Sequence, residues 1–79
     1  MNAALRDRLQ VLAAGLRCGR STEAAVDLPA LMTDIAAALG TGAALAALAE
    51  VMPAMVAQWQ REDWIALADT LEHEVGRIA

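Results

Sequence analysis

A polar cluster near the end of the chain holds the side chains whose types and spacing best suit a metal site. Asp69, Glu72, His73 and Glu74 lie close together in sequence, and in a helix Asp69 and His73 share one face, where they could share an ion. A di-iron bundle, however, takes Glu-x-x-His motifs from separate helices, and the residue three before His73 is Thr70. With one histidine in the chain, a zinc site of His and Cys would need several chains. A solvated polar face is the simpler interpretation, and a metal site of Asp69, Glu72 and His73 is the alternative.

Cys18 is the other side chain with possible chemistry. A catalytic cysteine needs an activating group such as a histidine beside it, and the only histidine, His73, falls on the outer face of its own helix. We interpret Cys18 as a small residue in a helix contact. Because the chain has no lysine, Gly40-Thr41-Gly42 is not a P-loop, and we expect a turn between helices there. The sequence indicates no catalytic residue, no cofactor and no enzymatic activity.

A band of methionine and tryptophan side chains is the candidate binding surface. Met52, Met55, Trp59 and Trp64 are placed so that they could line an adaptable groove for a partner helix, a role in which flexible methionine is common. The alternative is that the same band forms the core or a dimer interface. These four residues are the predicted partner-binding site.

The stretch around Asp63–Val75 must position both candidate sites. Asp63 is a suitable N-cap, and the residues after it follow the period of an amphipathic helix. Its predicted apolar stripe consists of Trp64, Leu67, Ala68, Leu71, Val75 and Ile78. Asp69, His73 and Arg77 form a line on the opposite face, and Glu72 and Glu74 lie at the edges of the stripe. We expect the other helices to pack on this stripe.

The first helix is predicted from about Ala3 to Arg17, closed by Gly19 in a left-handed conformation. Its main stripe has the spacing of a coiled-coil seam and a weaker stripe of small residues runs beside it, so the helix is expected to contact two neighbours. The main stripe is Leu5, Leu9, Leu12 and Leu16; the second is Ala4, Val11, Gly15 and Cys18. Arg17 is expected to face water.

Two more helices are predicted in the middle of the chain. The least regular stretch, 19–26, is expected to be a mobile loop, after which Asp27 caps a helix with Pro29 in its first turn. Gly40 ends that helix, and Thr41 caps the next one at once, which makes the two antiparallel. Pro53 is expected to kink the third helix. A single long helix running through Asp63 is the alternative to a turn at 60–62.

The composition predicts self-association. The chain has 79 residues, of which 58% are hydrophobic and 3% aromatic, and much of the apolar fraction is alanine. Alanine favours helix but buries little area, so a monomer of this size would have a thin core and excess apolar surface. The back of the third helix, at Ala46, Ala54 and Ala57, carries little charge, which suggests that a second surface packs there. A homodimer is the simplest remedy.

Charge and cysteine content limit the functional class. The net charge is −4 and there is no basic cluster, which argues against nucleic-acid binding. Arginines concentrate in the first helix and acidic residues in the last, so the two ends are expected to pack together, within one chain or across a dimer. A single cysteine fits a reducing cytoplasm. We expect no signal peptide, and the uncharged window Ile35–Ala49 is too short for a membrane span.

The tail also carries a resemblance. Asp63 followed by Trp64-Ile65-Ala66-Leu67-Ala68-Asp69-Thr70-Leu71-Glu72-His73-Glu74-Val75 resembles the D-aromatic-x-x-L-A-D-x-L-E-x-E-hydrophobic pattern of small uncharacterised bacterial helical proteins, some of them encoded among flagellar and surface-glycosylation genes. An aromatic residue is usual in that pattern where this chain has His73. The resemblance implies a helical fold and a role near flagellar or export machinery. It implies no activity.

These observations predict one all-α domain over residues 1–79, a three- to four-helix antiparallel bundle completed by homodimerisation. The preferred function is a small non-enzymatic cytoplasmic interaction protein, an adaptor or export-chaperone-like module. It would act through the Met/Trp band and the acidic face of the last helix. The alternative is a metal- or small-ligand-binding bundle that uses carboxylates and His73.

Overall fold

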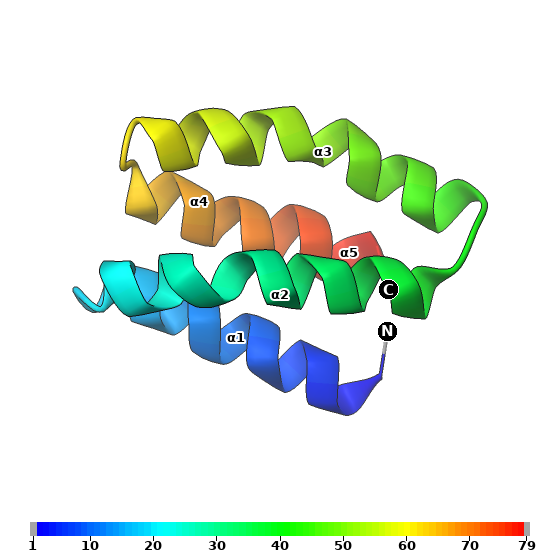
Figure 1. The fold of residues 1–79 in the computed structure, drawn as a ribbon, viewed down its shortest axis with the longest axis horizontal. Coiled ribbons are helices and arrows are strands. Elements are labelled where there is room, and N and C mark those ends of the chain that lie inside the picture. The colour runs from blue at the N-terminus through cyan, green and yellow to red at the C-terminus, as the bar shows by residue number, and fades with distance from the viewer. Residues whose placement is uncertain (1, 79) are drawn as a thin grey trace.

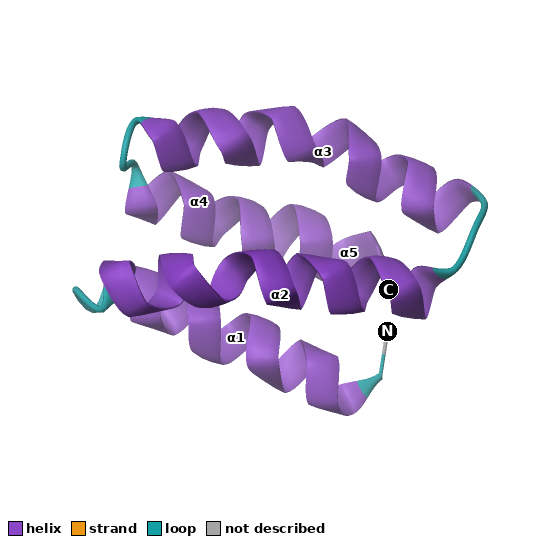
Figure 2. Ribbon diagram, viewed as in Figure 1, coloured by secondary structure: helices purple, strands orange, loops and turns teal. Residues whose placement is uncertain are grey.

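The computed structural model describes residues 2–78, and within them all regular structure is helical (Figure 2). α1 (Ala3–Arg17), α2 (Ser21–Leu39) and α3 (Ala43–Gln60) are followed by a last rod made of α4 (Trp64–Thr70), a π-helical stretch η1 (Leu71–Val75) and α5 (Gly76–Ile78). The four rods run back and forth as antiparallel neighbours (Figure 1). α1 contacts α2 and the last rod extensively, α3 contacts the last rod, and the contact between α2 and α3 is the smallest of the neighbouring pairs. The predicted all-α fold is confirmed.

The core lies where the apolar stripes of the four rods meet. All four leucines of the predicted main stripe of α1 are buried, and the last rod contributes four side chains that are completely enclosed, as the sequence predicted. The largest enclosed side chains are Leu31, Ile35, Leu67, Leu71 and Val75. α3 supplies only two buried residues, Leu48 and Met55. Most buried residues of the core therefore come from α1, α2 and the last rod, and α3 contributes the fewest.

The π-helical stretch explains how the last rod keeps its stripe aligned. In a regular α-helix each step of four residues drifts by about 40° around the axis. Leu67, Leu71 and Val75 are spaced by four and all are fully buried. Between Leu71 and Val75 the backbone widens, and the Gly76 N–H donates to the Leu71 carbonyl, five residues back. The wider turn offsets the drift, so Val75 still faces the core.

The predicted loop at 19–26 is wrong. α2 begins at Ser21, and Ala24 and Ala25 are buried against the bundle. A β-carbon placed on Gly15 would lie 3.6 Å from that of Ala24, so α1 and α2 approach closely here. Burial of this alanine face outweighs the weak helix signals of the local sequence. As a result Pro29 lies well inside α2, not in its first turn, and Asp27 is an exposed mid-helix residue, not a cap.

Glycines form the turn between α2 and α3. Gly40 ends α2 as predicted and adopts a positive φ of 71°, and Gly42 follows with a φ of 109°. Both angles are costly for residues with a side chain. The predicted Thr41 cap is wrong, since Gly42 is the N-cap of α3 and no side chain caps that end. Pro53 lies inside α3 as expected.

A turn at Arg61–Asp63 separates α3 from α4, so the alternative of one continuous helix is wrong. The predicted cap is confirmed, because the Asp63 side chain accepts a hydrogen bond of 3.3 Å from the Ala66 N–H. The Asp63 N–H donates to the Gln58 carbonyl, and the Glu62 N–H donates to the Trp59 carbonyl. These paired bonds are those of a Schellman motif, which needs a left-handed residue after the helix. Glu62 occupies that place with a φ of 55°.

We expect Glu62→Gly to stabilise the protein. A side chain in the left-handed region costs about 1–2 kcal/mol, and the greater flexibility of glycine in the unfolded chain cancels about 0.5–1 kcal/mol of the gain. The net increase should be roughly 0.5–1 kcal/mol, a rise in Tm of several degrees for a domain of this size. Thermal melts followed by circular dichroism would measure it. Glu62→Ala is the control, because it removes the same charge but keeps the strained backbone; equal stabilisation by both variants would contradict the explanation.

Candidate functional site

The predicted Met/Trp band divides into a buried part and an accessible part. Met55 is only 2% exposed and belongs to the core, so it is not accessible on the monomer. Met52, Trp59 and Trp64 pack on the same core but remain partly exposed. Val56, an apolar residue of the same helix, is 47% exposed. The accessible apolar surface on this side of the molecule is therefore made by Met52, Val56 and Trp59, which we call the seam surface.

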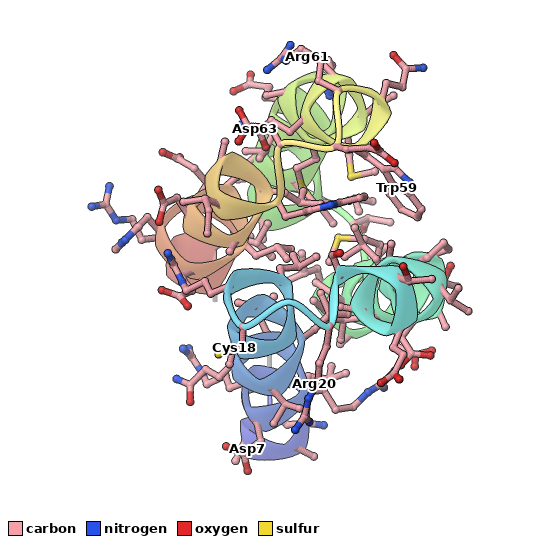
Figure 3. The ribbon with its side chains drawn as sticks, turned by 90° about the vertical axis from the view of Figure 1, so that its left-hand side faces the viewer. Asp7, Cys18, Arg20, Trp59, Arg61 and Asp63 are labelled. Carbon is pink, nitrogen blue, oxygen red and sulfur yellow. The ribbon has the colours of Figure 1, made fainter. Side chains whose placement is uncertain are left out.

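The seam surface lies beside the contact between α2 and α3. Figure 3 shows Trp59 on the side of α3 that faces α2, the neighbouring pair with the smallest contact. Among the hydrogen bonds of the described residues, none involves the indole N–H of Trp59 or Trp64. The seam surface has no titratable side chain of its own. Its chemistry is that of a binding surface, with apolar area to bury and an N–H to donate.

The acidic face of the last rod is partly neutralised by Arg17, which is exposed as predicted but also binds two carboxylates of that rod. The Arg17 Nη2 lies 2.6 Å from Asp69 Oδ1 and 3.0 Å from Glu72 Oε2, and its Nε donates to Glu72 Oε1 at 3.3 Å. The prediction that the arginine-rich first helix packs on the acidic last helix is confirmed within one chain. The other ion pair of the described residues joins Arg8 to Asp34, 2.7 Å apart.

These contacts have an electrostatic consequence for Arg17. The hydrogen bonds that Arg17 donates, first to Glu72 and then to Asp69, raise the pKa of Arg17 above its ordinary value. A raised pKa stabilises the folded state below that pKa, and the stabilisation is lost only when the pH rises through it. Arginine is already charged throughout the neutral range, so the raised pKa of Arg17 adds no pH dependence there, and we expect this triad to respond to salt.

The remaining predicted metal ligands do not gather around a common point. His73 and Glu74 are exposed, whereas Asp69 and Glu72 are directed to Arg17. Within residues 2–78 no group of three or more His, Cys, Asp or Glu side chains is arranged to hold a metal ion. A cation at Asp69 and Glu72 would have to compete with the guanidinium that both carboxylates already bind.

Cys18 is not in a helix contact, which corrects the sequence interpretation. It is exposed just beyond the end of α1, and Figure 3 shows it at the outside of that helix. Val11, from the same weak stripe, is 72% exposed. The second stripe of α1 therefore packs on α2 mainly through Gly15 and leaves its other members open.

A groove between α1 and α2, which the sequence analysis did not find, follows this open stripe. Its volume is about 730 Å³. Val11, Leu12, Gly15 and Ala24 are among the apolar residues that line it, and charged residues of both signs surround them: Asp7, Arg8, Arg20, Glu23 and Asp27. The weak stripe of small residues on the first helix was the only sequence signal for it. The mixed charges select no ligand class.

Comparison with known proteins provides no relative from which the role of the site could be inferred. No protein-family model, no curated protein and no solved structure matches this chain. The resemblance of the tail to small bacterial helical proteins therefore stays a prediction. Within residues 2–78, no helix combines the length and the apolar character needed to cross a bilayer.

Proposed function

We propose that the chain is a small non-enzymatic interaction protein, an adaptor or export-chaperone-like module, that binds a protein partner through its seam surface. The observation that carries the proposal is the side chain of Val56, 47% exposed beside the partly exposed Met52 and Trp59 at the loosest contact of the bundle. Large apolar side chains gathered at one place on a small protein favour a role in association. Trp64 extends the same core-facing band.

The proposed partner is a helix with an apolar stripe. Such a helix would lie along the seam between α2 and α3, where Trp59 offers apolar area and an unused N–H. The predicted acidic surface contributes less than the sequence suggested, because Arg17 binds Asp69 and Glu72. Glu74 and His73 are exposed and lie outside the ion pairs of Arg17. We place the protein in the cytoplasm because its lone cysteine is unpaired.

The proposal includes a homodimer. α3 supplies only Leu48 and Met55 to the buried core, although it is 18 residues long. Four of its other apolar side chains, Leu45, Val51, Met52 and Trp59, are only partly buried against the core. A second copy would bury more of this helix, which is the physical reason for proposing self-association.

Substitution of Trp59 tests the partner surface. We expect tagged wild-type protein to capture a defined partner from a lysate of the source cells, and Trp59→Ala to reduce that capture on the order of tenfold, as expected for the loss of a tryptophan anchor. Ile65→Ala is the matched control, because Ile65 is a large exposed apolar residue, 53% exposed, on the other side of the chain turn. Circular dichroism would show that both variants are folded. Equal capture by wild type and Trp59→Ala would overturn the proposed surface.

A metal- or small-ligand-binding bundle is the second candidate function. It rests on His73 and Glu74 being exposed beside Asp69 and Glu72. Elemental analysis of the purified protein distinguishes it from the first. Stoichiometric metal that is lost in His73→Ala would favour the metal site over the interaction module.

A further inference from the structure

The outward side of α3 is an unpartnered helix face. It carries Pro53 and three exposed alanines, Ala46, Ala49 and Ala54. Figure 3 shows α3 as the outermost rod on its side of the bundle, with Arg61 directed away from the other helices. This face is distinct from the seam surface, because Trp59 and Met52 lie on the side of α3 that packs on the core.

The two charged side chains of this face lie on the same side of the helix, about three turns apart. Along α3 and its C-cap, the charged residues are Glu50 and Arg61, and both are exposed. Eleven residues separate them, which is close to three turns, so they lie within about 20° of each other around the axis and about 16 Å apart along it. The ion pairs formed among the described residues involve neither of them. Each charge is therefore available to a partner.

A face with an acid at one end and a base at the other is complementary to itself when two copies lie antiparallel. Consider a two-fold axis that crosses the helix at the level midway between residues 55 and 56. It places Glu50 of each copy opposite Arg61 of the other, and Ala54 opposite Ala57. In a parallel pair each charge would instead meet its own copy. The small side chains between the charges allow the two axes to approach closely.

We propose that this outward face of α3 is the homodimer interface, formed with α3 of a second copy in the antiparallel orientation. This inference rests on the homodimer of the proposed function and adds which face, which orientation and which ion pairs form it. It leaves the seam surface of each subunit free for the protein partner.

The size of the face sets the expected affinity. An 18-residue helix is about 27 Å long, so one helix against another buries an area at the low end of specific interfaces. The two Glu50–Arg61 pairs lie near the rim and contribute orientation more than affinity. We therefore expect a dissociation constant in the micromolar range, and measurements must cover that range of concentration.

Charge-swap variants test the inference by sedimentation equilibrium. In Glu50→Arg the two ends of the dimer would carry facing arginines, and in Arg61→Glu they would carry facing carboxylates. We expect each single variant to weaken the dimer on the order of tenfold or more. The double variant Glu50→Arg/Arg61→Glu should recover most of the wild-type affinity, since the pairs form again with reversed polarity. Glu23→Arg is the control for Glu50→Arg, because it makes the same change of net charge on an exposed site of α2.

Each outcome decides between this inference and the proposal on which it rests. A wild-type dimer weakened by both single variants and rescued by the double variant supports the antiparallel interface. A dimer weakened by the single variants but not rescued overturns the antiparallel orientation. A dimer that responds no more to these variants than to Glu23→Arg overturns the interface but not dimerisation. A wild-type monomer at all concentrations overturns both.

Discussion

Leu71→Ala is expected to remove a large part of the stability of the fold. Leu71 is completely enclosed, and it begins the π-helical stretch that holds the last rod against the core. Truncating a fully buried leucine leaves a cavity, and the free energy of unfolding should fall by about 3–5 kcal/mol. For a domain whose total stability is on the order of 5–15 kcal/mol, the melting temperature should fall by well over 10 °C. Chemical denaturation at one fixed protein concentration would measure the loss.

The control for this experiment is Val26→Ala. Val26 is also a branched aliphatic residue on a helix, but it is 72% exposed, so its truncation should change the free energy of unfolding by less than about 0.5 kcal/mol. Similar losses in the two variants would mean that the last rod does not organise the core as described.

Ala68→Leu is expected to destabilise the protein by overpacking. Ala68 in α4 and Ala13 in α1 are both completely buried, and α1 packs extensively on this rod. Larger side chains in a filled space displace their neighbours at a cost of about 1–3 kcal/mol. We expect the upper part of that range, because Arg17 holds α1 to Asp69 and Glu72 and limits how far the two helices can separate.

Ala37→Leu is the matched control for overpacking. Ala37 is exposed in α2, and leucine is a good helix former, so this variant should be neutral or slightly more stable. The same denaturation experiment compares the two. If Ala68→Leu were as stable as the wild type, the interface between α1 and α4 would have room for a larger side chain, which would contradict the tight packing described above.

Much of the fold was predictable because strong periodic signals coincide with burial. The leucines of α1 and four members of the stripe of the last rod, Leu67, Ala68, Leu71 and Val75, are apolar, regularly spaced and buried. Asp63 caps α4 by accepting a hydrogen bond from the Ala66 N–H, and Gly19 ends α1 with a positive φ of 87°. Where the local pattern and the tertiary contacts favour the same structure, the sequence is sufficient.

The errors arose where tertiary packing outweighed local signals. Proline and aspartate at 27–29 are typical of a helix start, yet α2 begins at Ser21 because Ala24 and Ala25 pack against the bundle. The π-helical stretch has no local sequence signature that we could recognise; it follows from aligning Leu71 with Val75. Such features depend on contacts between distant residues, which periodicity does not report.

The candidate site was predictable only in part, for a related reason. The spacing of Met52, Met55 and Trp59 places them on one side of α3 but does not say how deeply each is buried. The structure encloses Met55 and leaves Val56 exposed at the edge. Similarly, the sequence predicted that basic and acidic helices would meet, but the choice of Arg17 as the residue that binds Asp69 and Glu72 depends on the rotation of both helices. Burial and helix rotation therefore limit what sequence can predict here.

The central claim is that this alanine-rich subunit completes its buried surface against a second copy. The most direct test is the molecular mass of the purified chain in solution, measured by sedimentation equilibrium from low to high micromolar concentration. The account predicts a reversible change from the 8.3 kDa of one chain to twice that mass as concentration rises. A mass of 8.3 kDa at every concentration, with cooperative melting at high temperature, would contradict it.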